Sequence, residues 1–177
     1  GVGPLELLGV ETVPATAYES EYFLCVDGVE YDLGLKGWSL AQWLFDARSN
    51  QLYFDGFRRP GEDGGYYSGI MSVNLADGAG QVREYAEYAS LRLVYGGNVY
   101  YFQDWNAEDG GDLYRNGEFV CDDVLEVWPV PDSNAVVAVT DYDEDSQSGT
   151  LKLLLEKGGE PVEIGADVDL TTFPFGA

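Results

Sequence analysis

The stretch of residues 98–121, NVYYFQDWNAEDGGDLYRNGEFVC, decides the fold class. It begins with a β-branched and aromatic run, passes through an acidic, glycine-rich loop and returns to Asn116-Gly117. This dipeptide supplies the two positive φ angles of a tight hairpin turn, and the run that follows supplies the next strand. The stretch therefore predicts consecutive antiparallel strands.

The same order of parts recurs on both sides of this stretch, which indicates repeats. Each copy has an apolar run, a turn with an asparagine, a β run, an acidic loop rich in glycine, and a final hairpin. The turn asparagines and hairpin dipeptides are Asn50, Asn98, Asn134, Asp77-Gly78, Asn116-Gly117 and Gly158-Gly159. Each copy predicts a four-stranded antiparallel sheet of propeller-blade size, and the copies cover about residues 38–87, 88–122 and 123–166.

The two ends of the chain predict one further blade, split between the termini. Residues 18–35 hold a hairpin around Asp27-Gly28, and residues 167–174 hold one more strand, Val168 to Phe173. If one end completes the sheet of the other, two open edges are hidden. We therefore expect a single all-β domain over residues 1–177, a propeller-like array of four-stranded antiparallel blades with three whole repeats and one split blade. A slice of a longer propeller and an open β array are the alternatives.

Charge and composition exclude several classes of function. The net charge is −23, from 32 acidic and 9 basic residues, so the chain lacks the basic surface that nucleic-acid binding needs. The chain has no histidine, which excludes Ser-His-Asp and Cys-His mechanisms. Cys25 and Cys121 predict two buried thiols, with one disulfide as the alternative. No run is long enough for a membrane span and no apolar leader opens the chain, so we expect no direct membrane insertion and no retained signal sequence.

Two segments resemble a known family. NVYYF at 98–102 with GDLYRNG at 111–117, and AVVAVTDYD at 135–143 with GTLKL at 149–153, look like TolB-like β-propeller repeats. The resemblance is closest to uncharacterised members of bacterial envelope proteins and covers about residues 22–170. It implies a non-enzymatic, extracytoplasmic scaffold or binding domain, without a catalytic motif to transfer. Such propellers commonly have more blades than this chain supplies.

Aromatic residues in the acidic loops are the predicted ligand-binding residues. Tyr66 and Tyr67 belong to the first loop, Trp105 to the second and Tyr142 to the third. Aromatic faces flanked by acids suit sugar rings, basic peptides or cationic groups, although the same rings could instead pack over neighbouring loops. Trp38, Trp43 and Trp128 fall on strand patterns and are predicted to lie in the core.

The acidic loop at residues 141–149 predicts a calcium site as an alternative to a solvated hairpin loop. Asp141, Asp143 and Asp145 alternate and can aim several oxygens at one ion. However, Ser146 stands where an EF-type loop has glycine, and Lys152 stands where it has a bidentate glutamate.

The sequence as a whole predicts a non-catalytic binding domain of a bacterial surface or envelope protein that needs no cofactor. The expected partner is a protein, peptide or glycan, recognised through the acidic aromatic loops. Two alternatives remain open. One is a carbohydrate-active hydrolase with paired carboxylates, and the other is a calcium-stabilised structural spacer.

Overall fold

The computed structural model describes residues 6–11, 20–26, 28–33, 38–58, 67–75 and 82–172. Every regular element in these ranges is a β-strand, and all strand pairs are antiparallel. The predicted all-β class is therefore confirmed. The chain divides into two compact units, Gly1–Leu91 and Arg92–Ala177, and each is described by itself.

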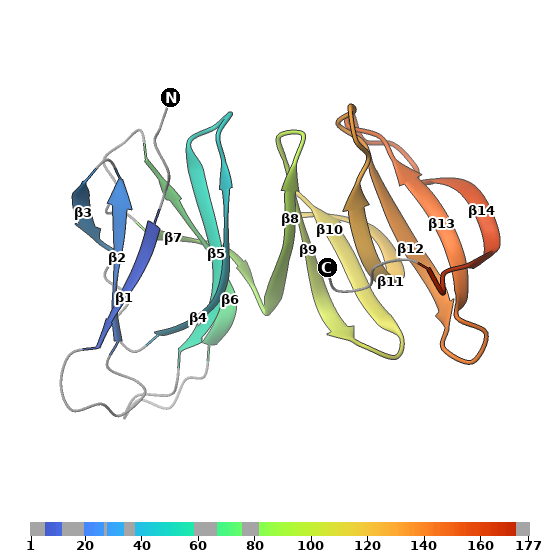
Figure 1. Ribbon diagram of the computed structural model, residues 1–177, viewed down its shortest axis with the longest axis horizontal. Helices are drawn as coiled ribbons and strands as arrows, with labels where there is room; N and C mark the ends of the chain where they lie inside the picture. The colour runs from blue at the N-terminus through green and yellow to red at the C-terminus, as the bar shows by residue number, and fades with distance from the viewer. Residues whose placement is uncertain are drawn as a thin grey trace. The chain divides into compact units, whose positions relative to one another are not determined.

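The first unit contains two sheets, each with its strands in chain order (Figure 1). The smaller sheet consists of β1 (Glu6–Glu11), β2 (Ser20–Val26) and β3 (Val29–Asp32). The larger sheet consists of β4 (Trp38–Asp46), β5 (Gln51–Arg58), β6 (Tyr67–Asn74) and β7 (Val82–Glu87). The larger sheet has the four strands predicted for the first repeat, whereas β1 was not predicted.

One hydrophobic core joins these two sheets. Leu24 and Leu33 come from the smaller sheet and its end, and they pack with Leu52 and Phe54 of β5 and with residues of β6. All four of these side chains are at most 2% exposed. The alternation along β5 places Leu52 and Phe54 on the same face, as expected for a strand that covers a core on one side.

The second unit is built on a seven-stranded sheet in which the strands also follow chain order (Figure 1). Its strands are β8 (Ala89–Tyr95), β9 (Asn98–Asn106), β10 (Gly110–Arg115), β11 (Glu118–Pro129), β12 (Val136–Asp143), β13 (Ser148–Leu154) and β14 (Val162–Asp169). The first residues of β8 belong to the first unit. The eight strand segments predicted for the second and third repeats fall on these strands, two of them on β11, except that Ala135 and Leu155 lie one residue outside β12 and β13.

The long strand β11 joins the second repeat to the third. Its first half pairs with β10, and its second half pairs with β12. Val124 is the residue that pairs on both sides, with Gly111 and with Thr140. The last strand of one predicted blade and the first strand of the next are thus continuous, so the structure has one seven-stranded sheet where two separate sheets were expected.

The two repeats nevertheless share one core and place their corresponding turns together. Tyr100, Phe102 and Leu113 of the second repeat cluster with Val136 and Ala138 of the third. The Tyr95 hydroxyl lies 2.8 Å from the Val130 carbonyl oxygen, which joins the turns between the first two strands of each repeat. Arg115 donates to the Leu155 carbonyl oxygen at 2.9 Å, which joins the turns before the last strands.

The turn dipeptides behave as their chemistry predicts where the structure describes them. Asn116 and Gly117 have φ values of 51° and 86°, and Gly158 and Gly159 have values of 86° and 88°. Asp77-Gly78 lies outside the described residues. The turn predicted at Gly97-Asn98 falls one residue earlier, at Gly96 and Gly97, because Asn98 already begins β9.

The C-terminal segment differs from the expected split blade. Val168 and Asp169 end β14 and pair with Gly149 and Ser148 of β13. Leu170 continues this attachment, since its amide donates to the Gln147 carbonyl oxygen at 2.9 Å and its side chain is fully buried. The predicted hairpin near the N-terminus exists as β2 and β3, but β1 is the strand that pairs with β2. Phe173 lies outside the described residues.

Candidate functional site

The predicted aromatic residues occupy different strands. Tyr66 lies outside the described residues, and Tyr67 begins β6, where it pairs with Arg58. Trp105 lies near the end of β9 and is 45% exposed. Its indole nitrogen donates to the Leu125 carbonyl oxygen at 3.1 Å, so the ring is held against β11. Tyr142 lies in β12 and is half-buried.

Trp105 and Tyr142 have corresponding positions in neighbouring repeats. Each directly follows an aspartate with positive φ, which is Asp104 at 52° and Asp141 at 51°. The match in backbone conformation supports the sequence alignment of the two acidic loops. Tyr67 belongs to the first unit, whereas Trp105 and Tyr142 belong to the second.

Two of the three carboxylates predicted to bind calcium accept local hydrogen bonds. Asp143 accepts from the backbone amides of Asp145 and Ser146 at 2.9 and 3.2 Å, and Asp141 accepts from the Thr140 hydroxyl at 2.9 Å. The first pair of bonds is the Asx-turn geometry that shapes a tight loop. Within the described ranges, no group of three or more His, Cys, Asp or Glu residues is arranged to hold a metal ion. The calcium spacer and the hydrolase both stay predictions.

The three strand tryptophans have different environments. Trp38 is 8% exposed and belongs to the core of the first unit, as predicted. Trp43 is 40% exposed, so its predicted core position is wrong. Trp128 is half-buried and lines a hollow on the surface of the third repeat.

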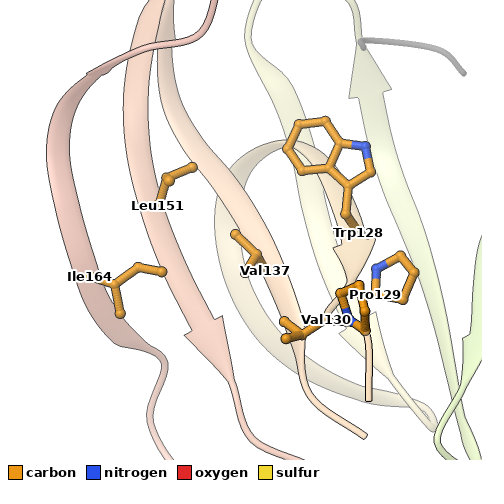
Figure 2. A pocket seen from close by; sticks show the side chains of 7 residues that line it. Trp128, Pro129, Val130, Val137, Leu151 and Ile164 are labelled. Atoms are coloured by element: carbon orange, nitrogen blue, oxygen red, sulfur yellow. The ribbon is translucent and has the colours of Figure 1, made fainter. Parts of the chain in front are cut away.

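This hollow, which we call the β11–β14 hollow, is the candidate functional site. It has a volume of about 400 Å³. Its lining comes from four neighbouring strands and the loop after β11, and consists of Trp128, Pro129, Val130, Pro131, Val137, Leu151 and Ile164. Figure 2 shows Val137, Leu151 and Ile164 side by side on the successive strands β12, β13 and β14, with Trp128 on β11.

The lining contains no charged side chain, although the chain carries 32 acids. Ile164 is 54% exposed, and Val162 and Leu155 nearby in sequence are 47% and 49% exposed. Exposed acids directly neighbour lining residues in the sequence, since Asp132 follows Pro131 and Glu163 precedes Ile164. A contiguous apolar surface with a polar margin is the usual form of a protein-binding patch.

The sequence contains a signal for this surface that the loop-centred prediction missed. AVVAV at 135–139 and LKLLL at 151–155 are apolar at successive positions rather than at alternate ones. Such runs are typical of strands with apolar side chains on both faces. In β12, Val136 and Ala138 fill the core on one face, and Val137 lines the hollow on the other.

The perturbed ionisable groups lie outside the hollow. Burial raises the pKa of the Cys121 thiol to about 11, an effect that Lys152 opposes and that Asp122 and Asp141 reinforce. Cys121 is a free thiol in the core of the second unit, and its high pKa keeps it in the unreactive protonated form at neutral pH. The side chain of Cys25 lies outside the described residues.

Two further findings bear on classification. In the part of the chain that the structure describes, no helix has the length and apolar character to cross a membrane. Compared with known proteins, the chain matches no protein-family model and no curated protein sequence.

Proposed function

We propose that this chain is a non-catalytic protein-interaction domain that binds a partner polypeptide at the β11–β14 hollow. The observation that carries the proposal is a charge-free apolar surface on a chain with a net charge of −23. Burying one aliphatic side chain such as that of Ile164 contributes about 1.5–3 kcal/mol, so a patch of this kind is a strong source of binding energy.

The chemistry of the lining favours a polypeptide over a small polar ligand. Sites for small ligands combine apolar walls with a few polar groups that fix orientation. Apart from the Trp128 indole, the side chains that line the hollow are aliphatic or proline. Such a lining favours large apolar groups, and the apolar side chains of a protein partner provide them.

We also propose that the repeats form a propeller-like array. The shared core of the second and third repeats and the contacts between their corresponding turns support this arrangement. The extracytoplasmic, bacterial-envelope setting rests on the TolB-like resemblance of residues 98–117 and 135–153. The acidic aromatic loops around Trp105 and Tyr142 are the competing contact region.

A peptide selection tests the proposed function. A library of random displayed 12-residue peptides is selected on the immobilised wild-type chain and then measured against the Ile164→Asp and Trp105→Ala variants. We expect selected peptides to be rich in aliphatic and aromatic residues. Their affinity for Ile164→Asp should fall at least tenfold, which corresponds to about 1.4 kcal/mol, and should change little for Trp105→Ala.

Because Ile164 is 54% exposed, its substitution by aspartate leaves the core intact, and an unchanged unfolding transition serves as the control. Peptides that keep their affinity for Ile164→Asp but lose it for Trp105→Ala would contradict the proposal. They would place binding at the acidic aromatic loops instead.

A further inference from the structure

The turn between β10 and β11 contains the only Asn-Gly pair of the sequence, Asn116-Gly117. An asparagine before glycine can react with its own chain, because glycine has no Cβ to block the approach of its backbone nitrogen. The Gly117 nitrogen bonds to the Asn116 Cγ, its proton goes to the departing ammonia, and a succinimide ring closes. Water then opens the ring and leaves either aspartate or isoaspartate. The reaction needs only water.

The position is open to that water. Asn116 and Gly117 are both exposed, and a Cβ placed on Gly117 would meet nothing within 4 Å among the described residues. Each of the other asparagines is followed by a residue with a side chain, which slows ring closure. Chemistry and access therefore both single out Asn116 for deamidation.

The folded hairpin holds the Asn116 side chain away from this reaction. Its Oδ1 accepts from the Val99 amide at 2.8 Å, and its Nδ2 donates to the Asn98 Oδ1 at 2.7 Å. The Asn116 backbone amide also donates to the Val99 carbonyl oxygen at 2.9 Å. Ring closure has to bring the Asn116 Cγ onto the Gly117 nitrogen, so the carboxamide must first release β9.

The Val99 amide fixes the orientation of this network. Its hydrogen needs an acceptor, which sets the Asn116 oxygen toward Val99 and the Asn116 nitrogen toward Asn98. Asn98 then presents its oxygen to Asn116 and its nitrogen to the Glu156 carbonyl oxygen, at 3.5 Å. Asn98 is 8% exposed, so water has little access to replace these bonds.

We infer that Asn116 is a spontaneous deamidation site that the fold keeps unreactive, so that the modification records opening of the β10–β11 hairpin. The inference goes beyond the proposed function and does not depend on it. Local openings of a protein have free energies between zero and that of global unfolding. When opening and closing are fast, a reaction of the open form proceeds in proportion to the open fraction.

Both products disturb the closed turn. Each replaces the Asn116 carboxamide by a carboxylate, whose oxygen meets the Asn98 oxygen without a hydrogen between them. Isoaspartate also inserts an extra carbon into the backbone. Arg115 and Glu118 pair directly across the two-residue turn, so an added backbone atom disrupts their register. The covalent change thus makes a transient opening permanent.

Peptide mass spectrometry of the full chain tests the inference. Wild type, Asn98→Ala and Asn134→Ala are incubated near neutral pH, in buffer and in concentrated urea, and deamidation is followed at every asparagine. Asn134→Ala is the matched control, because Asn134 is a turn asparagine of the third repeat that donates to the Glu156 carboxylate. Asn98→Ala instead removes the acceptor of the Asn116 side chain.

We expect Asn116 to be the fastest site in urea and to react at least about tenfold more slowly in buffer. Asn98→Ala should raise the rate in buffer about tenfold, and Asn134→Ala should leave it close to that of wild type. Equal rates at Asn116 in buffer and urea, a faster site elsewhere in urea, or no effect of Asn98→Ala in the folded chain would overturn the inference.

Hydrogen exchange in wild type measures the same opening without a variant. The Val99 amide donates to the Asn116 Oδ1, so it exchanges when that bond opens. We expect NMR to show Val99 protected by about the factor that slows deamidation in buffer. An unprotected Val99 amide would contradict the inference, even if Asn98→Ala fails to fold.

Discussion

Tyr95 and Tyr100 differ in what their hydroxyl groups meet. The Tyr95 hydroxyl lies 2.8 Å from the Val130 carbonyl oxygen and 2.5 Å from that of Ser133. The Tyr100 side chain is fully buried, and its hydroxyl has no hydrogen-bond partner among the described residues. An unmade hydrogen bond in a core costs the desolvation of the polar group, so these two tyrosines contribute to stability with opposite sign.

Replacing each tyrosine by phenylalanine measures this difference. We expect Tyr100→Phe to raise the free energy of unfolding by up to about 1 kcal/mol, because it removes a buried unsatisfied hydroxyl. Tyr95→Phe should lower it by about 1 kcal/mol, because it removes a hydrogen bond. Urea denaturation of the two variants and wild type supplies the values. A clear loss of stability in Tyr100→Phe would mean that its hydroxyl has a partner.

Asp55 is a buried carboxylate with several donors around it. It is 6% exposed and accepts from the Leu91 amide at 2.8 Å, and from the amide and side-chain nitrogens of Gln42 at 3.1 Å each. Gln42 also donates to the Leu91 carbonyl oxygen. Burial raises the pKa of Asp55 above its usual value, while the hydrogen bonds from Gln42 and Leu91 oppose the rise. The carboxylate ties β4 to the start of β8.

The raised pKa gives Asp55 a defined dependence on pH. Asp55→Asn should lower the free energy of unfolding by about 1–2 kcal/mol at pH 7, since the amide has one acceptor oxygen in place of two. Because the folded-state pKa exceeds the unfolded-state value, the folded protein binds the proton more tightly. The advantage of wild type over the variant should therefore grow as pH falls from 7 to 5. Urea denaturation at each pH provides the test, with exposed Asp122→Asn as the control. A shrinking advantage would contradict the raised pKa.

At the scale of elements, the close approach of β10 to β11 depends on glycine. Gly110 has a φ of 79°, and a Cβ there would lie 2.5 Å from the Val124 carbonyl oxygen. Gly117 has a φ of 86°, but a Cβ there would meet nothing within 4 Å. Both positions have a backbone conformation that favours glycine. They differ only in whether a Cβ atom would have room.

The alanine variants separate these two requirements. Gly117→Ala should cost about 1 kcal/mol, which is the strain of a left-handed residue. Gly110→Ala should cost roughly 3 kcal/mol, because the backbone of β11 must also move away. The difference in free energy of unfolding between the variants, measured by urea denaturation, isolates the contact with Val124. Equal losses would mean that β10 and β11 are not packed this closely.

The elements themselves were largely predictable, and their connections were not. Turn chemistry at Asn116-Gly117 and apolar runs such as AVVAV at 135–139 are local signals, so the strands of all three repeats could be predicted. The continuity of β11 depends on which strands pair with Val124, which is a property of distant residues. The β11–β14 hollow could not be predicted for the same reason. An apolar run shows that both faces of a strand are apolar, but it does not show which face another sheet covers.

At the scale of the whole molecule, the dominant feature is the net charge of −23. Arg92 and Glu126 form an ion pair, but 32 acidic residues stand against 9 basic ones, so most acids have no basic residue to pair with. Most acids therefore repel one another through solvent, and this self-repulsion works against the compact state. Salt screens charges that are separated by more than about 8–10 Å at physiological ionic strength.

Stability should accordingly rise with ionic strength. We expect the melting temperature to increase by several degrees between about 10 and 300 mM NaCl, measured by circular dichroism at a protein concentration that keeps the chain monomeric. An unchanged or lower melting temperature would contradict the account of self-repulsion. CaCl₂ at matched ionic strength is the informative comparison. A larger rise in calcium that is lost in Asp143→Ala would favour the calcium-stabilised loop at Asp141, Asp143 and Asp145.

The central claim is that equivalent faces of the second and third repeats differ in cover, and a matched pair of leucines tests it most directly. Leu113 is opposite Phe102 and is fully buried, whereas Leu151, opposite Val139 at the corresponding place in the third repeat, lines the β11–β14 hollow. Hydroxyl-radical footprinting of the dilute wild-type chain, read by mass spectrometry, reports the oxidation rate of each leucine. The account predicts that Leu151 is oxidised several times faster than Leu113 and is protected when a selected peptide binds. Equal protection of the two leucines in the dilute chain would contradict it.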